Sequence, residues 1–188
     1  MNVYDFDETI LKGDTERYFF AWIFKKFPNL LKFHSEYLFY LTVQNMGLIT
    51  IDDSRPHMYK FLCEIENVDE IVEKFWDEHE RYVKKWYLAT QREDDVIVSA
   101  SPEFLLLPIC RRLGVKHLIA SHMDKKTGKL LGKFNYAEQK VIRFKEVFGD
   151  AKIDCFFSDS ESDRFIARLA DKAIKVIGDE LLEWKVKC

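Results

Sequence analysis

The order in which the hydrophobic periodicities follow one another constrains this chain more than any other feature. A short strand-like segment at the amino end precedes helical periodicity from about Asp14 to Gln91, with almost no strand signal. Strand-like and helical segments then alternate to the end of the chain. Such alternation predicts a mostly parallel sheet with helices on both faces, because parallel strands need crossover connections. We therefore expect a Rossmann-like α/β core that carries an inserted, all-helical segment.

The expected elements follow from these periodicities and from the turn residues between them. Besides the first strand, strands are expected over Asp95 to Ala100, Val115 to Ser121, Ile153 to Phe157 and Ala173 to Ile177. Helices are expected over Pro102 to Leu113, Tyr136 to Phe148 and Glu161 to Leu169, with a hairpin around Thr127 and Gly128. The insertion is expected to form about four helices, with breaks at Pro28, Asn45 to Gly47 and Asp52 to Pro56. This pattern predicts a core over residues 1–13 and 91–188 and a helical insertion over residues 14–90.

Composition restricts the class of protein. The 188 residues are 47% hydrophobic with 7 Gly and 4 Pro, which is typical of a globular domain and not of a disordered chain. A net charge of -3 with 32% charged residues gives no basic footprint, so we expect no nucleic-acid partner. Lys32, His34 and Glu36 interrupt the most apolar part of the first half, so we expect no integral membrane segment.

The cysteines and the amino end indicate a compartment. Cys63, Cys110, Cys155 and Cys188 are scattered without a Cys-x-x-Cys pair, so we expect reduced thiols and no zinc site. The first strand begins at once, with no basic leader or apolar run, which argues against secretion. We therefore expect a cytoplasmic protein. The sequence leaves the oligomeric state open.

Two carboxylates follow the first strand, in the segment Val3-Tyr4-Asp5-Phe6-Asp7. Side chains alternate along a strand, so Asp5 and Asp7 are expected to project together beyond its carboxyl end. Crowded carboxylates repel one another unless a cation or a shared proton relieves them. Such hard oxygen ligands favour Mg²⁺. The alternative is an ordinary turn, in which aspartate is common.

Two further polar clusters stand where a strand leads into a helix. The first is Ser99-Ala100-Ser101-Pro102, in which Ser101 is expected as N-cap with Pro102 at the first helical position. The Ser99 hydroxyl and the free N–H groups of that helix also suit a phosphate. The second is the acidic run from Ser158 to Asp163, which also fits a plain helix start. Lys140 lies between them and is either a solvated charge or, if it points at the clusters, a cation for carboxylate and phosphate.

Taken in order, these segments resemble the four signature motifs of the haloacid dehalogenase (HAD) superfamily of phosphohydrolases: Asp5-x-Asp7-x-Thr9, Ser99, Lys140 and Ser158-Asp159-x-x-x-Asp163. The helical insertion over residues 14–90 resembles the C1 cap, and the layout is similar to subfamily IB, which contains phosphoserine phosphatase. Such a cap opens for substrate and closes for chemistry, so the resemblance implies hinges near Lys12 to Asp14 and Thr90 to Asp94. The resemblance covers nearly the whole chain. Two residues depart from the family pattern, since Glu8 replaces a small residue and Ser158 replaces a glycine.

The resemblance implies a phosphatase with an aspartyl-phosphate intermediate. Asp5 would be the nucleophile, and Asp7 the general acid and base. Mg²⁺ would be bound by the Asp5 carboxylate, the Asp7 backbone carbonyl and Asp159, with Asp163 in support. The phosphoryl oxygens would be bound by Thr9, Ser99, the Ala100 N–H and Lys140. Dehalogenation is disfavoured, because a halide leaves without the proton that Asp7 would supply.

The resemblance implies a small phosphorylated substrate and leaves its identity open. Three acidic residues are candidates for substrate choice: Glu8, Asp14 and Glu16, of which Asp14 or Glu16 would be the counterpart of the cap glutamate of phosphoserine phosphatases. The second motif lacks the glycine pair of those enzymes.

A lipid phosphate is the alternative substrate class. The stretch Leu118-Ile119-Ala120-Ser121 and the aromatic-rich cap are similar to the phosphatidylglycerophosphatase branch, and aromatic rings would fit a membrane surface. Their helical spacing predicts first that they form the core of the cap. A phosphotransferase and a catalytically silent binding module are the remaining alternatives.

Overall fold

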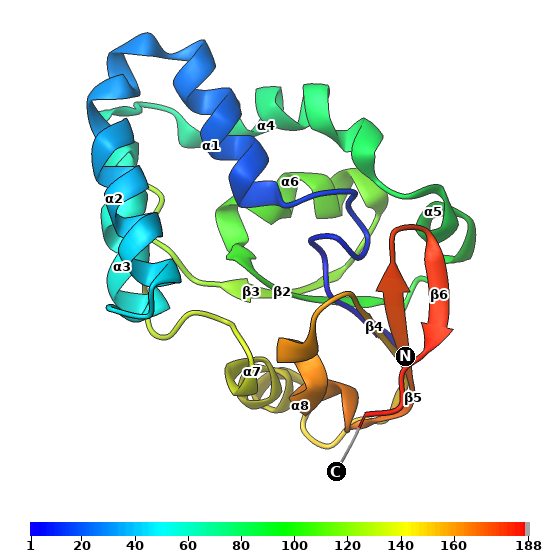
Figure 1. The fold of residues 1–188 in the computed structure, drawn as a ribbon. Coiled ribbons are helices and arrows are strands. Elements are labelled where there is room, and N and C mark those ends of the chain that lie inside the picture. The colour runs from blue at the N-terminus through cyan, green and yellow to red at the C-terminus, as the bar shows by residue number, and fades with distance from the viewer. Residues whose placement is uncertain (187–188) are drawn as a thin grey trace.

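The computed structural model describes residues 1–186 (Figure 1). Its centre is a six-stranded sheet with the order β3-β2-β1-β4-β5-β6. The parallel strands are β1 (Asn2–Tyr4), β2 (Val96–Pro102), β3 (His117–Ser121), β4 (Ile153–Ser158) and β5 (Ala170–Ile177). Strand β6 (Glu180–Glu183) pairs antiparallel with β5 and was not predicted, because its short, fully exposed sequence carries no alternating pattern. The prediction of a Rossmann-like α/β core is confirmed.

Successive residues of the central strands point into two different cores. Val3, Val96 and Val98 pack on one face, whereas Tyr4 and Ile97 pack on the other. Helices α7 (Glu138–Phe148) and α8 (Arg164–Ala167) cover the first face, and α5 (Lys85–Thr90) and α6 (Glu103–Leu113) the second. Both faces are therefore buried, which explains the nearly continuous apolar runs of these strands.

A helical cap follows β1 and lies over one end of the core (Figure 1). Its helices are α1 (Thr15–Lys26), α2 (His34–Asn45), α3 (Ile51–Met58) and α4 (Val68–His79), with 3-10 turns at Pro28–Phe33, Lys60–Glu64 and Glu80–Tyr82. Most of the aromatic side chains of α1 are buried, as their helical spacing predicted: Phe19, Phe20, Trp22 and Phe24. Phe39 on α2 differs, since 59% of its surface is exposed.

One predicted break in the cap is wrong. The segment from Asp52 to Pro56 lies inside α3. Thr50 caps this helix by accepting a hydrogen bond from the Asp53 N–H at 3.1 Å, and Pro56 removes only one backbone hydrogen bond of a short helix.

The segment by which the chain leaves the core and the segment by which it returns run side by side in opposite directions. Leu11 on the outgoing segment and Val83 on the returning one form an antiparallel bridge. Helix α5 follows this bridge in the chain and packs on the sheet. The ring centroids of Tyr87 and Tyr4 are 5.1 Å apart. The division at residues 14–90 stays a prediction. Because α5 already packs on the sheet, these contacts favour a second hinge near Tyr82 to Lys84, earlier in the chain than the predicted one at Thr90 to Asp94.

Two expectations from composition meet the structure here. Within residues 1–186, no helix combines the length and the apolar character that crossing a membrane requires. Cys63, Cys110 and Cys155 are free thiols, as expected. Cys188 lies outside the described residues.

The predicted hairpin around Gly128 forms and rests against the cap, which gives a test of this contact. A Cβ on Gly128 would lie 2.4 Å from the Tyr59 carbonyl oxygen, and its φ is +71°. Gly114 has nearly the same φ, +72°, with open space around it. Both Gly→Ala variants should lose about 1 to 2 kcal/mol to backbone strain. In urea denaturation, Gly128→Ala should lose about 1 to 3 kcal/mol more, because it also overpacks. Equal losses would contradict this contact.

Candidate active site

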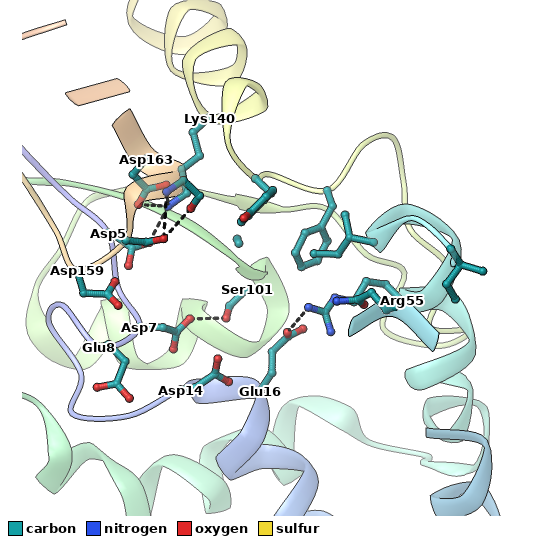
Figure 2. A pocket seen from close by; sticks show the side chains of 18 residues that line it. Asp5, Asp7, Glu8, Asp14, Glu16, Arg55, Ser101, Lys140, Asp159 and Asp163 are labelled. Atoms are coloured by element: carbon teal, nitrogen blue, oxygen red, sulfur yellow. Dashed lines mark hydrogen bonds and ion pairs between the residues drawn. The ribbon is translucent and has the colours of Figure 1, made fainter. Parts of the chain in front are cut away.

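The polar strand ends meet at the switch point of the sheet. The chain order reverses at β1, which lies between β2 and β4. Asp5 and Asp7 follow β1, Ser101 lies near the end of β2, and Asp159 follows β4. They line one cavity of about 580 Å³, whose far wall is the cap (Figure 2). This is where doubly wound sheets bind their ligands.

Lys140 points into this cavity and is not a solvated charge. Its Nζ donates hydrogen bonds to Asp5 Oδ1 at 2.7 Å and to Asp163 Oδ2 at 2.8 Å, and all three residues are buried. Burial lowers the pKa of Lys140, but the charges of Asp163 and Asp5 outweigh burial and raise it. Burial raises the pKa of Asp5, and the Lys140 ammonium opposes that rise. The ammonium therefore offsets part of the effect of burial on Asp5 and holds its carboxylate in one orientation.

Ser158, which replaces the glycine of the family pattern, has a local role in this cluster. Its hydroxyl donates to Asp163 Oδ2 at 2.8 Å and accepts a hydrogen bond from the Ser160 N–H at 3.0 Å. The serine thus fixes both the carboxylate that supports Lys140 and the turn after β4.

Asp7 has neutral partners from two other elements. Its Oδ1 accepts hydrogen bonds from the N–H and the hydroxyl of Thr15, the former at 2.6 Å, and its Oδ2 accepts one from the Ser101 hydroxyl at 2.7 Å. Burial and the charge of Asp14 raise the pKa of Asp7 to about 7, although the bonds from Ser101 and Thr15 lower it. Asp5 is therefore held by an ammonium and Asp7 by neutral donors, the kind of difference that separates a nucleophile from a proton carrier.

Ser101 differs from its predicted role. Strand β2 continues through Pro102 and α6 begins at Glu103, so Ser101 is not the N-cap of that helix. Its hydroxyl turns to Asp7 instead, at the same end of the strand as Ser99. The spacing Ser99-x-Ser101 on a strand was a signal for this role, because alternate residues share a face.

The candidate phosphate-binding residues differ in their access to the cavity. Ala100 lines it, as does Lys140. Thr9 and Ser99 are fully buried and do not line it. The Thr9 hydroxyl lies 3.3 Å from Asp5 Oδ2 and accepts a hydrogen bond from the Asp159 N–H at 3.0 Å, and the Ser99 hydroxyl accepts one from the Ser101 N–H at 3.1 Å. Their direct contact with phosphate stays a prediction, whereas the structure shows that both fix neighbouring site residues.

The donor set fits a magnesium ion. Among the described residues, two basic side chains line the cavity, Lys140 and Arg55, and acidic ones outnumber them: Asp5, Asp7, Glu8, Asp14, Glu16, Asp159 and Asp163. Among residues 1–186, no three His, Cys, Asp or Glu side chains form a metal-binding group by themselves. The predicted set needs only two, completed by the Asp7 backbone carbonyl, and the Thr9 hydroxyl lies within 3.5 Å of both Asp5 and Asp159. Oxygen donors with excess negative charge favour a hard cation that keeps part of its water shell.

The three candidates for substrate choice occupy different places. Glu8 is exposed at the edge of the cavity, with a left-handed φ of 55°. Asp14 caps α1 by accepting a hydrogen bond from the Arg17 N–H at 2.8 Å. Glu16 is buried in the wall of the cavity, 3.0 Å from the Arg55 guanidinium, and accepts a hydrogen bond from the Tyr59 hydroxyl.

Arg55 and Thr15 were missed at the level of sequence. Arg55 belongs to the segment that was expected to be a break, so nothing placed it on a helix facing the cavity. Thr15 starts α1 and has no motif around it that indicates a partner eight residues earlier.

Comparisons with known proteins identify the family and the fold. The family model of haloacid dehalogenase-like hydrolases matches residues 3–168. Protein CicA of Caulobacter vibrioides is 35% identical over 83 residues, which cover 41% of this chain and only 37% of the length of CicA.

Two solved structures share the fold. A protein of unknown function from Bordetella pertussis Tohama I has a TM-score of 0.75 at 22% identity, covering 93% of this chain and 88% of its own. A phosphoserine phosphohydrolase-like protein from Francisella tularensis has a TM-score of 0.60 at 18% identity, covering 96% and 90%. At such identities the likeness extends to the fold alone. The family match covers most of the chain, and the protein therefore belongs to the haloacid dehalogenase-like hydrolases, as the order of its four motifs predicted.

Proposed function

We propose that this HAD-type phosphatase is a Mg²⁺-dependent phosphomonoesterase that acts through an aspartyl-phosphate on Asp5. The observation that carries the proposal is the pair of carboxyl groups in one cavity with different partners, Lys140 for Asp5 and the donors of Thr15 and Ser101 for Asp7. A volume of about 580 Å³ suits a small phosphorylated metabolite. The Glu16 and Arg55 side chains in the cap wall would contact the part of the substrate that leaves.

The first half of the reaction transfers the phosphoryl group to the enzyme. A carboxylate oxygen of Asp5 attacks phosphorus as the bond to the ester oxygen breaks. Asp7 gives its proton to that oxygen, so that an alcohol leaves. Lys140 orients the Asp5 carboxylate and balances charge on the phosphoryl oxygens, together with the Ala100 N–H.

The second half returns the enzyme to its starting state. Asp7, now ionised, accepts a proton from a water molecule that attacks the phosphorus of the aspartyl-phosphate. The acyl phosphate bond breaks, which releases inorganic phosphate and restores the Asp5 carboxylate. Magnesium, held by Asp5, Asp159 and the Asp7 carbonyl, would supply charge neutralisation to both halves.

The first test measures phosphate release from a panel of soluble phosphomonoesters. Wild type should be active with Mg²⁺, inactive with excess EDTA and active again when Mg²⁺ is restored. Asp5→Asn should lose at least about 10³-fold in kcat, because the amide is no nucleophile. Asp150→Asn is the matched control, since that carboxyl is exposed and only faces Lys145. Unchanged activity of Asp5→Asn, or activity that survives EDTA, would contradict the mechanism.

A second test isolates the acid role of Asp7. An alkyl phosphate needs a proton on its leaving oxygen, whereas p-nitrophenyl phosphate releases a stable phenolate. Asp7→Asn should therefore lose about 10²-fold or more in the rate of phosphoenzyme formation with an alkyl ester, and much less with the nitrophenyl ester. Rapid-quench kinetics measure that step. Equal losses for both esters would assign Asp7 a role other than general acid.

A lipid phosphate is the second candidate substrate, and one surface favours it. Between Phe33 and Ile51 the only charged residue is Glu36, in a chain with 32% charged residues. Four large apolar side chains of this stretch are exposed by 45 to 66%: Leu38, Phe39, Met46 and Leu48. Ile49 and Ile51, in the same stretch, line the cavity. A stretch with a single charge, whose last residues line the cavity, suits an amphiphilic ester presented by a bilayer.

The lipid candidate is tested with phosphatidylglycerophosphate in phosphatidylcholine vesicles. Leu48→Asp should lower the rate of hydrolysis of the vesicle-borne lipid about tenfold and leave the rate with a soluble ester unchanged. A charge at this position opposes insertion of the loop between α2 and α3 into the bilayer. Val147→Asp on α7, which is 61% exposed, is the control and should change neither rate. If the enzyme hydrolyses soluble esters but not phosphatidylglycerophosphate in vesicles, the lipid candidate is excluded.

A further inference from the structure

Lys84 is a buried ammonium that the mechanism does not use. Only 5% of its surface is exposed. Its Nζ donates one hydrogen bond to the Glu8 carbonyl and another to the Gly178 carbonyl, the latter at 2.6 Å. Neither acceptor is a carboxylate, and burial lowers the pKa of Lys84. The carboxylates of Asp179, Glu8 and Asp159 offset part of the cost of burying this charge, but both of its hydrogen bonds go to neutral backbone carbonyls.

The contact fixes the backbone of the first motif. The Glu8 N–H donates to the Gly13 carbonyl at 2.9 Å, and the Glu8 carbonyl accepts from Lys84. Both polar groups of this residue are thereby held while its φ is 55°, a conformation that a residue with a Cβ rarely adopts. The peptide on the amino side of Glu8 contains the Asp7 carbonyl. The bond from the Glu8 N–H to Gly13 holds this peptide directly, and the bond from Lys84 holds the next peptide, so that the two together fix the backbone angles of Glu8 and thereby the orientation of the Asp7 carbonyl.

Lys84 also connects this loop to two other parts of the core. Its backbone N–H donates to the Ile10 carbonyl at 2.8 Å, beside the bridge between Leu11 and Val83. Gly178 is in the turn between β5 and β6, and this turn lies close to α5 in Figure 1. One side chain thus ties together the first motif, the segment by which the chain returns from the cap, and the last hairpin of the sheet.

We propose that Lys84 is a positioning residue, which holds the Asp7–Glu8 peptide in the orientation that magnesium binding at the Asp7 carbonyl requires. The inference rests on the proposed function. Lys84 does not touch the substrate in this role. It acts through the backbone of Glu8, as residues behind a metal ligand commonly do, and their loss lowers metal affinity by about 10- to 100-fold.

The test compares Lys84→Met, which keeps the length but loses the charge and the donors, with Lys85→Met, the same change at the exposed neighbour. Mg²⁺ alone is titrated by calorimetry, and kcat and KM are measured at saturating Mg²⁺. Lys84→Met should weaken Mg²⁺ binding about tenfold or more and lower kcat, with KM within about twofold of wild type. Hydrogen exchange in the metal-free protein should be faster across residues 5–13. Lys85→Met should match wild type in Mg²⁺ affinity, in kcat and KM, and in hydrogen exchange.

Lys84→Gln keeps an NH₂ group that can donate, without the charge and on a side chain one atom shorter, and should fall between Lys84→Met and wild type in Mg²⁺ affinity. A folded Lys84→Met protein with wild-type Mg²⁺ affinity and kcat would overturn the proposal. If Lys84→Met does not fold, Lys84→Gln decides, and a lower melting temperature with unchanged Mg²⁺ affinity would mean a purely structural role. Failure of both variants to fold would also overturn it, because Lys84 would then serve the whole fold.

The outcome is separable from that of the proposed function. The proposed function fails if wild type itself releases no phosphate, or releases it without Mg²⁺. The proposed role of Lys84 is contradicted only by the measurements on the Lys84→Met and Lys84→Gln variants. Hydrogen exchange of residues 5–13 needs neither substrate nor metal, so unchanged exchange in Lys84→Met would overturn the anchoring even in an inactive protein.

Discussion

The balance of charge at the carboxyl ends of β1 and β4 is the constraint on which the rest of the structure depends. Asp5 and Asp163 share the Lys140 ammonium, and all three are buried. Such a cluster is tolerable only when every member is present, because a buried charge without its partner costs several kcal/mol. The three residues come from the first strand, from α7 and from the turn after β4. The crossover of α7 to the far side of β1 is what brings them together.

The cap completes the site as well as covering it. Asp5 has its partners entirely within the core, whereas one partner of Asp7 is Thr15, the first residue of α1. A shift of α1 relative to the sheet therefore changes the surroundings of Asp7 and leaves those of Asp5 intact. Proton transfer would respond to cap position more than nucleophilic attack does. In the proposed mechanism, this would give the cap a chemical means to couple substrate enclosure to turnover.

The sequence predicted the parts of the site that depend on local chemistry. Asp5, Asp7 and Asp159 stand directly after strands, so a correct alternation of strands and helices was enough to bring them together. Arg55 and Lys84 depend on the path of the chain instead. Arg55 reaches the cavity only because Asp52 to Pro56 is helical, and Lys84 contacts a carbonyl 94 residues away. The hydrophobic periodicity of a short sequence segment cannot predict a contact between residues so far apart in the chain.

Glu8 shows how local and distant requirements combine at a single residue. Its side chain is exposed at the edge of the cavity, while its backbone is in a left-handed conformation that favours glycine. The strain, about 1 to 2 kcal/mol, is offset by the hydrogen bond that the Glu8 N–H donates and by the one that the Glu8 carbonyl accepts. A departure from the family pattern that first suggested only substrate choice is thus also a matter of backbone geometry. Because Lys84 supplies one of those bonds, a change at Glu8 and a change at Lys84 act on the backbone of the same residue, and their effects should not be additive.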